Sequence, residues 1–210
     1  MSQTMTNPQV HTSEPTPTPQ PTSAAALGLA AFALNLFLIA ASFTGELPST
    51  LVPLFLSTGL AFGAVEAWVG AHEFRIGSPF TGLVFGSFGA FWIATGLIFL
   101  LMNAHLLDFG NDFQKAMGLY FIAWTLLTSY LWIGSALVNA IGFTVFTVLM
   151  AAMIFFTLWG FGLVTVKIGA WLGVLDAVLA FYMSAAILLN TMTDRIVLPV
   201  GRALLSPATT

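Results

Sequence analysis

Long apolar stretches alternate with short polar ones along almost the whole chain. Six of the apolar stretches reach the roughly 20 residues that a helix needs to cross the hydrocarbon core of a bilayer. Because unpaired backbone groups are too costly in lipid, stretches of this length predict transmembrane helices. They cover residues 24–44, 48–70, 80–102, 116–136, 139–161 and 169–190. The pattern therefore predicts an all-α, polytopic membrane protein, with six transmembrane helices per protomer in one domain over residues 23–205.

The residues before the first apolar stretch have a different composition. Residues 1–22 read MSQTMTNPQVHTSEPTPTPQPT, which is rich in Pro and Thr and almost without apolar side chains. Such a segment cannot bury enough apolar surface to offset the entropy of ordering, so we expect a disordered tail. It also lacks the basic region and apolar core of a signal peptide. The first apolar stretch is therefore expected to remain in the protein as a helix.

Composition supports a membrane protein and narrows its chemistry. The 210 residues are 58% hydrophobic and 6% charged, which leaves too few charges for an ordinary soluble surface. A net charge of -3 leaves no basic patch for nucleic acid. The sequence has no Cys, its histidines lack metal-ligand spacing, and it contains no nucleophile motif or glycine-rich phosphate loop. We expect no enzymatic activity, no cofactor and no metal, and a surface in contact with membrane lipid.

The basic residues between the predicted helices indicate an orientation. Six helices place both termini on one side of the membrane. That side would carry Arg75, Arg195 and Arg202, whereas the opposite side would carry Lys115 and Lys167. Because cytoplasmic loops are enriched in Lys and Arg, the distribution favours a multi-pass protein of the cell membrane with cytoplasmic termini.

The stretch from Glu66 to Trp92 joins the second and third predicted helices through a polar turn that contains Glu73 and Arg75. At helical spacing, the third helix then carries one side of small residues and a neighbouring aromatic side. The small residues are Gly82, Gly86, Gly89 and Ala90, and the aromatic ones are Phe85, Phe88 and Trp92. Glycine faces allow helices to approach closely. The pattern is typical of helix packing, or of close packing that holds an aromatic stripe against a pore.

A second apolar stripe occurs in the fifth predicted helix. Its members are Phe143, Phe146, Leu149, Met150 and Met153. A stripe at this spacing forms a core or lipid contact, or else a hydrophobic constriction that gates a pore by excluding water.

Two acidic residues lie inside predicted helices, Glu66 in the second and Asp176 in the sixth. A charge within the bilayer is expensive, so both acids are functional candidates, with proton coupling as the hypothesis. The alternative is a structural role, in which Glu66 reaches the nearby polar turn or either acid is uncharged.

No Lys or Arg falls inside a predicted helix, so an anionic substrate would be held by helix N-termini and uncharged donors. Candidate donors are Asn35, Ser78, Thr81, Ser87 and Thr144. Helical Ser and Thr side chains also bond to their own backbone, which is the alternative for each.

Several segments resemble the acetate uptake transporter family, of the succinate-acetate permease type. Where that family has N-P-A-P-L-G-L followed by Phe, this chain has Ser23-Ala24-Ala25-Ala26-Leu27-Gly28-Leu29 and then Phe32. The family's G-x-x-E, G-N-x-F and S-Y-G-x-F-W segments correspond to Gly70-Ala71-His72-Glu73, Gly77-Ser78-Pro79-Phe80 and Ser87-Phe88-Gly89-Ala90-Phe91-Trp92. The likeness covers essentially the whole chain after the tail.

The resemblance implies a homohexamer in which each protomer has its own pathway for acetate and related short-chain carboxylates, with succinate among the candidates. It implies a narrow hydrophobic constriction formed by Phe32, Phe88 and Leu149. It also places Leu27, Gly28, Leu29 and Phe80 along the pathway. Two departures stand out: Phe88 replaces the family's tyrosine, and the Asn-Pro-x-Pro segment is absent.

Other functions stay open. The pathway could be a channel for small neutral solutes or for another weak acid, and transport could be an anion-channel or a proton-symport process. A third alternative is a membrane scaffold or carboxylate sensor without transport activity.

Overall fold

The computed structural model of the protein describes residues 22–205. Within them it contains six α-helices, two short 3-10 helices and no strand. The elements are α1 (Ala25–Phe43), η1 (Ser49–Leu51), α2 (Val52–Arg75), α3 (Pro79–Asn103), η2 (Gly110–Asp112), α4 (Phe113–Ser135), α5 (Ala140–Gly160) and α6 (Val166–Thr193). Each α-helix is long and apolar enough to cross a membrane. The predicted all-α class with six membrane-spanning helices is confirmed. The predicted tail, residues 1–22, lies outside the described residues except for Thr22.

Several helices extend beyond the apolar stretches that predict them. In particular, α2 continues to Arg75 instead of ending at residue 70. Hydropathy marks where a helix leaves the apolar layer, whereas its backbone hydrogen bonding continues until a residue interrupts it. Gly77, with φ +79, supplies the interruption, because the left-handed conformation favours glycine. His72 and Glu73, expected in the turn, therefore belong to the end of α2.

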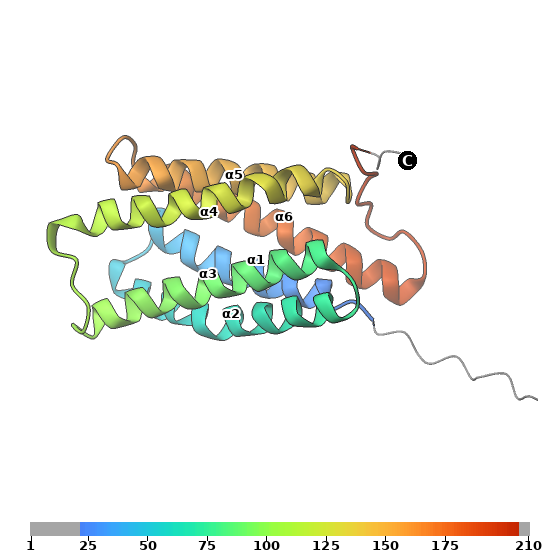
Figure 1. The fold of residues 1–210 in the computed structure, drawn as a ribbon, viewed down its shortest axis with the longest axis horizontal. Helices are drawn as coiled ribbons and strands as arrows, with labels where there is room; N and C mark the ends of the chain where they lie inside the picture. Colours follow the sequence, from blue (N-terminus) through green and yellow to red (C-terminus); the bar gives the residue numbers. More distant parts are fainter. Residues whose placement is uncertain (1–21, 206–210) are drawn as a thin grey trace, which may run out of the picture.

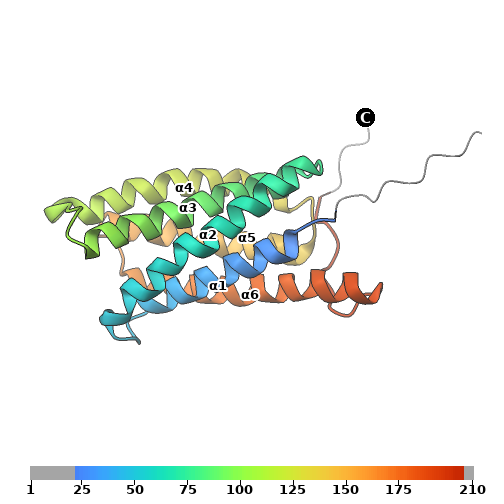
Figure 2. The same cartoon turned by 90° about the horizontal axis from the view of Figure 1, so that it is seen from below.

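The helices form an elongated bundle with antiparallel neighbours (Figure 1, Figure 2). The most extensive contacts join α2 to α3, α1 to α6 and α4 to α5, with α1–α2 and α5–α6 contacts completing most of a ring. The start of α1, the end of α6 and the α2–α3 and α4–α5 turns lie at one end, here called the terminal end. Residues 44–51, 104–112 and 161–165 lie at the other end, here called the loop end (Figure 1).

Glycines bring α2 and α3 into backbone contact. A Cβ added to Gly63 would lie 2.8 Å from the carbonyl oxygen of Gly89, and one added to Gly59 would lie 2.8 Å from the carbonyl oxygen of Trp92. One added to Gly70 would collide with the backbone of Gly86. Contacts this short are closed to any side chain, so glycine is required at these three positions of α2.

Aromatic side chains fill the space between α3 and α4, whose backbones are farther apart. The Phe91 ring stacks on Tyr120 at a centroid distance of 5.6 Å and meets Trp124 edge to face at 4.9 Å. Edge-to-face and offset pairs are the favourable arrangements of aromatic rings. The glycine side of α3 thus faces α2, and its aromatic side faces α4 and the centre of the bundle.

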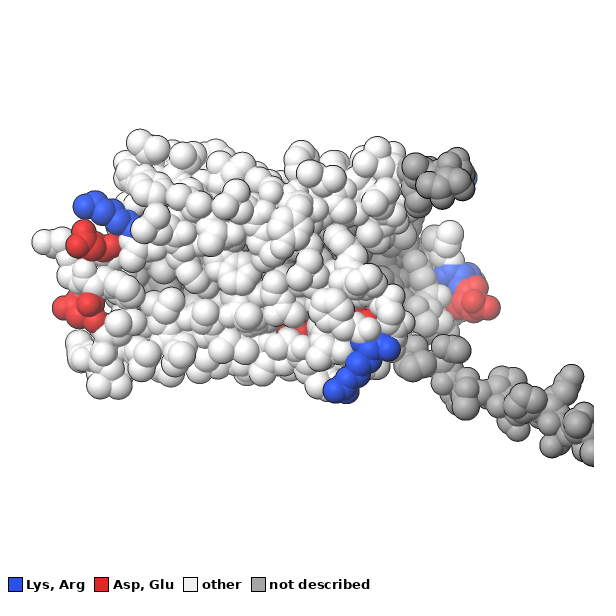
Figure 3. Space-filling view, viewed as in Figure 1, with Lys and Arg blue, Asp and Glu red and all other residues white. Residues whose placement is uncertain are grey.

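The outer surface suits a membrane. Figure 3 shows most Lys, Arg, Asp and Glu side chains toward the two ends of the molecule, with a broad surface between them that is almost free of charge. The exposed apolar side chains include Leu119 (65% exposed) and Leu126 (64% exposed) on α4. In water these would be unfavourable, whereas lipid can cover them.

The segment after α6 folds back across the terminal end. The Asn190 side chain holds it by accepting hydrogen bonds from the backbone N–H groups of Val197 (2.7 Å) and Leu198 (3.0 Å). Farther along, the carbonyl of Val200 accepts a hydrogen bond of 3.0 Å from the N–H of Ile141 in the first turn of α5. The segment therefore fixes the start of α5.

Candidate functional site

A cavity of about 150 Å³ lies near the terminal end of the bundle. We call it the near cavity. It lies between the first turns of α1, α3 and α5 and the last turns of α6. Its lining residues are Ala25, Leu29, Phe80, Thr81, Val84, Phe85, Val138, Asn139, Gly142, Val145, Phe146, Met183 and Ile187.

A much smaller cavity, of about 20 Å³, lies at the middle of the bundle. We call it the central cavity. Its volume is close to the space that one water molecule needs. Its lining residues are Leu29, Phe32, Val84, Phe85, Phe88, Val145, Phe146 and Leu149.

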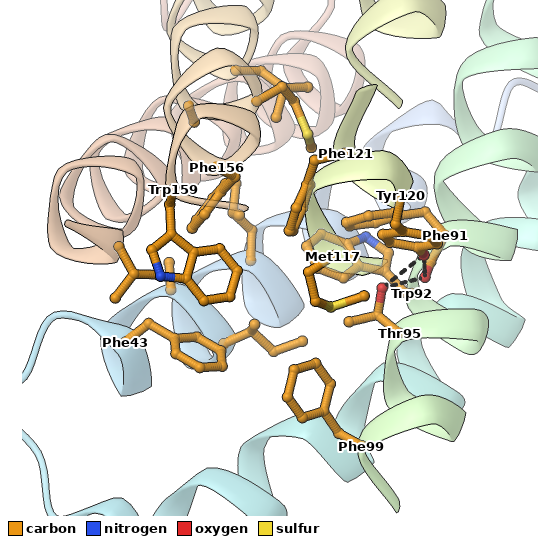
Figure 4. A pocket seen from close by; sticks show the side chains of 17 residues that line it. Phe43, Phe91, Trp92, Thr95, Phe99, Met117, Tyr120, Phe121, Phe156 and Trp159 are labelled. Atoms are coloured by element: carbon orange, nitrogen blue, oxygen red, sulfur yellow. Dashed lines mark hydrogen bonds between the residues drawn. The ribbon is translucent and has the colours of Figure 1, made fainter. Parts of the chain in front are cut away.

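A third cavity, of about 60 Å³, lies toward the loop end (Figure 4). We call it the far cavity. Most of its wall is aromatic or aliphatic. Its lining residues are Leu36, Ile39, Ala40, Phe43, Phe91, Trp92, Thr95, Phe99, Met117, Tyr120, Phe121, Leu149, Ala152, Met153, Phe156, Trp159 and Val166.

The three cavities follow one another along the bundle. Leu29, Val84, Phe85, Val145 and Phe146 line both the near and the central cavity. Leu149 lines both the central and the far cavity. Successive cavities are therefore adjacent, with the single side chain of Leu149 between the central and the far cavity, and the narrow point between the two larger cavities is the central cavity.

The narrow point is tightly packed. The rings of Phe32 and Phe88 meet edge to face at a centroid distance of 5.6 Å, and Phe88 also contacts Trp124 at 6.1 Å. Phe88 and Leu149 are 1% and 2% exposed. Every side chain that lines the central cavity is a hydrocarbon. We call the layer of Phe32, Phe88 and Leu149 the waist.

Polar groups collect at the near cavity instead. Thr81 lies in the first turn of α3 and Asn139 is the N-cap of α5, where its Oδ1 accepts a hydrogen bond of 2.7 Å from the N–H of Gly142. The first N–H groups of a helix have no partner within the helix and form the positive end of its dipole. The start of α3 therefore offers helix donors to this cavity, whereas at the start of α5 the N–H groups of Ile141 and Gly142 are already paired with the Val200 carbonyl and the Asn139 Oδ1.

The N-terminus of α1 also reaches the near cavity, but its first donors are occupied. The Glu73 carboxylate accepts hydrogen bonds from the N–H of Ala24 (2.7 Å) and the hydroxyl of Ser23 (2.9 Å). The Ser23 Oγ in turn accepts a hydrogen bond of 3.2 Å from the N–H of Ala25. This end of α1 is capped by the protein itself.

One pair of hydroxyl groups lies beside the far cavity (Figure 4). The hydroxyls of Thr95 and Tyr120 are 3.0 Å apart, and both also lie within hydrogen-bonding distance of the Phe91 carbonyl oxygen, at 2.7 and 3.1 Å. Each hydroxyl has one hydrogen to donate. The protein oxygens of this cluster can accept both.

The sequence-based candidates fall into two groups. Phe32, Phe88 and Leu149, the three implied constriction residues, lie together around the central cavity. Of the candidate pathway residues, Leu29, Phe80 and Thr81 line the near cavity. The structure thus brings these six residues onto one line through the bundle.

The remaining pathway candidates do not line the cavities. Leu27 is 49% exposed, and Gly28 is covered by the ring of Phe85. Asn35 is fully buried and accepts a hydrogen bond of 3.0 Å from Thr58. Ser78 is the N-cap residue of α3 and makes no side-chain cap.

Two further hydroxyl candidates bond to their own helices. The Ser87 hydroxyl donates to the carbonyl of Leu83 at 2.6 Å, and the Thr144 hydroxyl donates to that of Ala140 at 2.9 Å. This is the structural alternative expected for helical Ser and Thr side chains.

The two buried acids lie outside the cavity walls. Glu66 and Asp176 are both 0% exposed, and neither carboxyl group makes a hydrogen bond to any of residues 22–205. The Trp92 indole faces Glu66, without reaching ordinary hydrogen-bonding geometry. Glu66 therefore sits behind Trp92, whose ring contacts Phe32 at a centroid distance of 6.0 Å.

Several residues that line the cavities are not among the candidates predicted from the sequence. Val145 lies one helical turn before Leu149, and Val84 one turn before Phe88, so helical spacing from the constriction residues could have identified both. Asn139 directly precedes an apolar stretch, and Asn is a preferred N-cap residue, so its position at the start of α5 could also have been predicted. Among the described residues, no group of three or more acidic or His side chains could hold a metal ion.

Comparisons with solved structures identify a similar fold. The chain superimposes on the structure of the bacterial acetate channel SatP with a TM-score of 0.74 and 25% sequence identity, covering 86% of this chain and 99% of that one. Together with the six membrane-length helices, this likeness supports a multi-pass membrane protein.

Sequence comparisons find fungal relatives. The chain is 25% identical over 200 residues to acetate permease A of Emericella nidulans. The alignment covers 86% of this chain and 66% of that protein. It is 28% identical over 167 residues to ammonia transport outward protein 2 of Saccharomyces cerevisiae, covering 76% of this chain and 59% of that protein. The chain thus spans 66% and 59% of the lengths of these curated relatives.

The family profile described as GPR1/FUN34/yaaH matches residues 3–202, nearly the whole chain. This match, with SatP and acetate permease A among the similar proteins, confirms the resemblance to the acetate uptake transporters. The chain belongs to the GPR1/FUN34/yaaH family.

Proposed function

We propose that the protein conducts acetate and related short-chain monocarboxylates across a membrane. The observation that carries the proposal is the line of three cavities through one protomer, with Phe32, Phe88 and Leu149 at its narrowest point. The likeness to the bacterial acetate channel SatP and to acetate permease A supports acetate as the substrate.

The near cavity provides hydrogen-bond donors for a carboxyl group. The start of α3 and the side chains of Thr81 and Asn139 border it, whereas the first N–H groups of α5 are already paired within the protein. Helix N-termini bind carboxylate oxygens without a cation. This arrangement favours weak binding, which a channel needs for fast release.

The waist is closed to acetate in this conformation. The central cavity, at about 20 Å³, holds about one water molecule, and acetate is larger. Passage therefore requires the side chains of Phe32, Phe88 and Leu149 to move apart. Rotamer changes of this kind are local and fast compared with helix motions, so the waist acts as a hydrophobic gate.

Acetate fits this pathway better than succinate. A dicarboxylate must bring a second carboxylate through the same hydrocarbon waist, where no donor or cation lines the wall. Each unpaired carboxylate adds a desolvation cost. Succinate uptake is accordingly expected to be slower than acetate uptake.

A homohexamer is the proposed assembly, as the family resemblance implies. Exposed apolar side chains of other helices, such as Trp68 on α2 and Trp171 on α6, provide surfaces that neighbouring protomers or lipid can cover. Because the three cavities belong to one chain, each protomer would conduct independently.

Two routes for a proton fit the pathway. The proton can cross on the substrate, as the undissociated acid, or it can move through a buried acid such as Glu66 or Asp176. Both side chains are buried within helices that surround the cavities. Their substitution separates the two routes.

The test is uptake of labelled acetate into proteoliposomes. Leu149→Trp places a larger side chain between the central and far cavities, whereas Leu126→Trp makes the same change on the exposed face of α4. We expect saturable uptake by the parent protein and by Leu126→Trp, and none by Leu149→Trp. Uptake no faster than in empty vesicles, or full uptake by Leu149→Trp, would refute the proposal.

A further inference from the structure

The waist offers nothing that could replace the water around an anion. The central cavity is lined by side chains of Phe, Leu and Val only, and no backbone turn or helix end opens into it. It has room for about one water molecule, so a solute that passes must leave its hydration shell behind.

Charge is what makes this transfer expensive. Moving an ionised carboxylate from water into apolar surroundings costs far more than moving a neutral carboxylic acid, unless the ion is paired or hydrogen-bonded. The acid form keeps one O–H and one C=O, so its desolvation costs only as much free energy as that of a neutral polar group. A hydrocarbon waist therefore discriminates strongly between the two forms of the same molecule.

No cation of the bundle compensates for an anion at the waist. The helices α1, α3 and α5, which supply every residue of the central cavity, contain no Asp, Glu, Lys, Arg, His or Tyr. Away from the helix ends, the titratable side chains of the surrounding helices are Glu66 on α2, Asp176 and Tyr182 on α6, and Tyr120 and Tyr130 on α4, and none of them lines this cavity. None of the five is a cation, and the two acids do not attract a carboxylate.

The remaining charged side chains lie at the helix ends. At the terminal end, α2 carries His72, Glu73 and Arg75, and at the loop end Lys115 and Lys167 occupy the first turns of α4 and α6. Figure 3 shows most of the Lys, Arg, Asp and Glu side chains of this face toward the two ends of the molecule. A carboxylate at the waist would be far from any partner.

The far cavity likewise favours the neutral carboxylic acid over the carboxylate. The hydroxyl hydrogens of Thr95 and Tyr120 can both be donated within the cluster that includes the Phe91 carbonyl. While these bonds persist, the pair can only accept a hydrogen bond from a solute. A carboxylic acid has an O–H group to donate, and a carboxylate has none.

We propose that the species that crosses the waist is the uncharged carboxylic acid. A carboxylate takes up one proton from water in the near cavity, forming R–COOH, and the same O–H bond breaks when the acid reaches water beyond the far cavity. One proton and one carboxylate cross together, so no net charge moves. The inference rests on the proposed function and names the form of its substrate.

The test measures charge movement and uses a neutral analogue. Full-length protein in liposomes is given labelled acetate near neutral pH while a potassium diffusion potential is imposed with an ionophore, and acetamide is supplied in parallel. Acetamide has nearly the shape of acetic acid and, unlike acetate, carries no charge. We expect acetate influx that does not respond to the potential, and acetamide influx above that of the Leu149→Trp variant.

Each other outcome has a distinct meaning. Acetate influx that rises when the vesicle interior is positive, or exclusion of acetamide, would overturn the inference and leave acetate conduction intact. If neither solute enters faster than in empty vesicles, the proposed function itself fails. Leu126→Trp, expected to match the parent with both solutes, controls for reconstitution.

Discussion

The carboxylate of Glu73, at the end of α2, accepts a hydrogen bond of 2.7 Å from the backbone N–H of Ala24, at the start of α1. Glu73 is 1% exposed and also accepts a hydrogen bond from the Ser23 hydroxyl at 2.9 Å. Next to it, the Nε2 of His72 lies 2.9 Å from the carbonyl oxygen of Thr22. The end of α2 therefore holds the start of the helix that carries Phe32 to the waist.

Removing this cap should destabilise the protein. Glu73→Ala removes a buried carboxylate and leaves two part-buried donors without their charged acceptor, so we expect a loss of about 1–3 kcal/mol in the free energy of unfolding. Denaturant unfolding of the purified protein in detergent measures it. Glu46→Ala, at an exposed position between α1 and α2, is the control. Equal stability of the two variants would show that the cap contributes nothing.

The backbone contact between α2 and α3 should tolerate no side chain at Gly70. A Cβ there collides with the backbone of Gly86, whereas one on Gly86 itself would have nothing within 4 Å. Gly70→Ala is expected to lower stability by about 1–3 kcal/mol through overpacking. Gly86→Ala should be neutral or stabilising by up to about 1 kcal/mol, because Ala is the better helix former. A thermal unfolding series that ranks the two variants in the opposite order would contradict this account.

The sequence predicts the bundle well because membrane burial leaves a local signal. Long apolar stretches mark all six helices, and the Gly82–Gly89 side of α3 marks a face where another helix comes close. The hydrogen bond between Glu73 and Ala24 leaves no local pattern in the sequence. The two residues are 49 positions apart, and the contact exists only once α1 and α2 have packed. Nor does helical spacing alone indicate whether the stripe of α5 faces lipid or a cavity. The contacts with α1 and α3 determine that.

Hydroxyl side chains illustrate the same limit. Thr81 and Ser87 are both on α3, yet Thr81 lines the near cavity and Ser87 bonds to its own helix. Whether a hydroxyl lines the cavity or bonds to its own helix depends on which neighbouring helix covers that side of α3. The residues around the hydroxyl in the sequence do not determine this.

Enlarging the waist should relax the size limit of transport. Leu149→Ala joins the central and far cavities by removing the one side chain that lines both. We expect the uptake of butyrate relative to acetate to rise about tenfold, in line with the discrimination that a methylene provides in an apolar pocket. Labelled uptake with both acids measures the ratio, and gel filtration checks assembly. Leu126→Ala should leave the ratio at its parent value, and an unchanged ratio in Leu149→Ala would argue against Leu149 as a limiting residue.

The pH dependence of uptake should be independent of the buried acids. If the proton crosses on the substrate, then above the pKa of the acid the rate at fixed total acetate rises about tenfold for each pH unit of acidification, because the undissociated fraction does so. Glu66→Gln and Asp176→Asn should keep that slope, measured as initial uptake across a pH series. A flattened slope in either variant would instead assign proton transfer to that side chain.

The central claim is that the three cavities form the pathway, and thiol labelling tests it most directly because the chain has no native Cys. Val84→Cys puts a thiol where the near and central cavities meet, and Val178→Cys puts one on the outer face of α6, at a position 53% exposed. A small methanethiosulfonate is added to proteoliposomes and acetate uptake is measured before and after. The account predicts that the reagent abolishes uptake by Val84→Cys and leaves Val178→Cys unaffected. Full uptake by completely labelled Val84→Cys protein would contradict it.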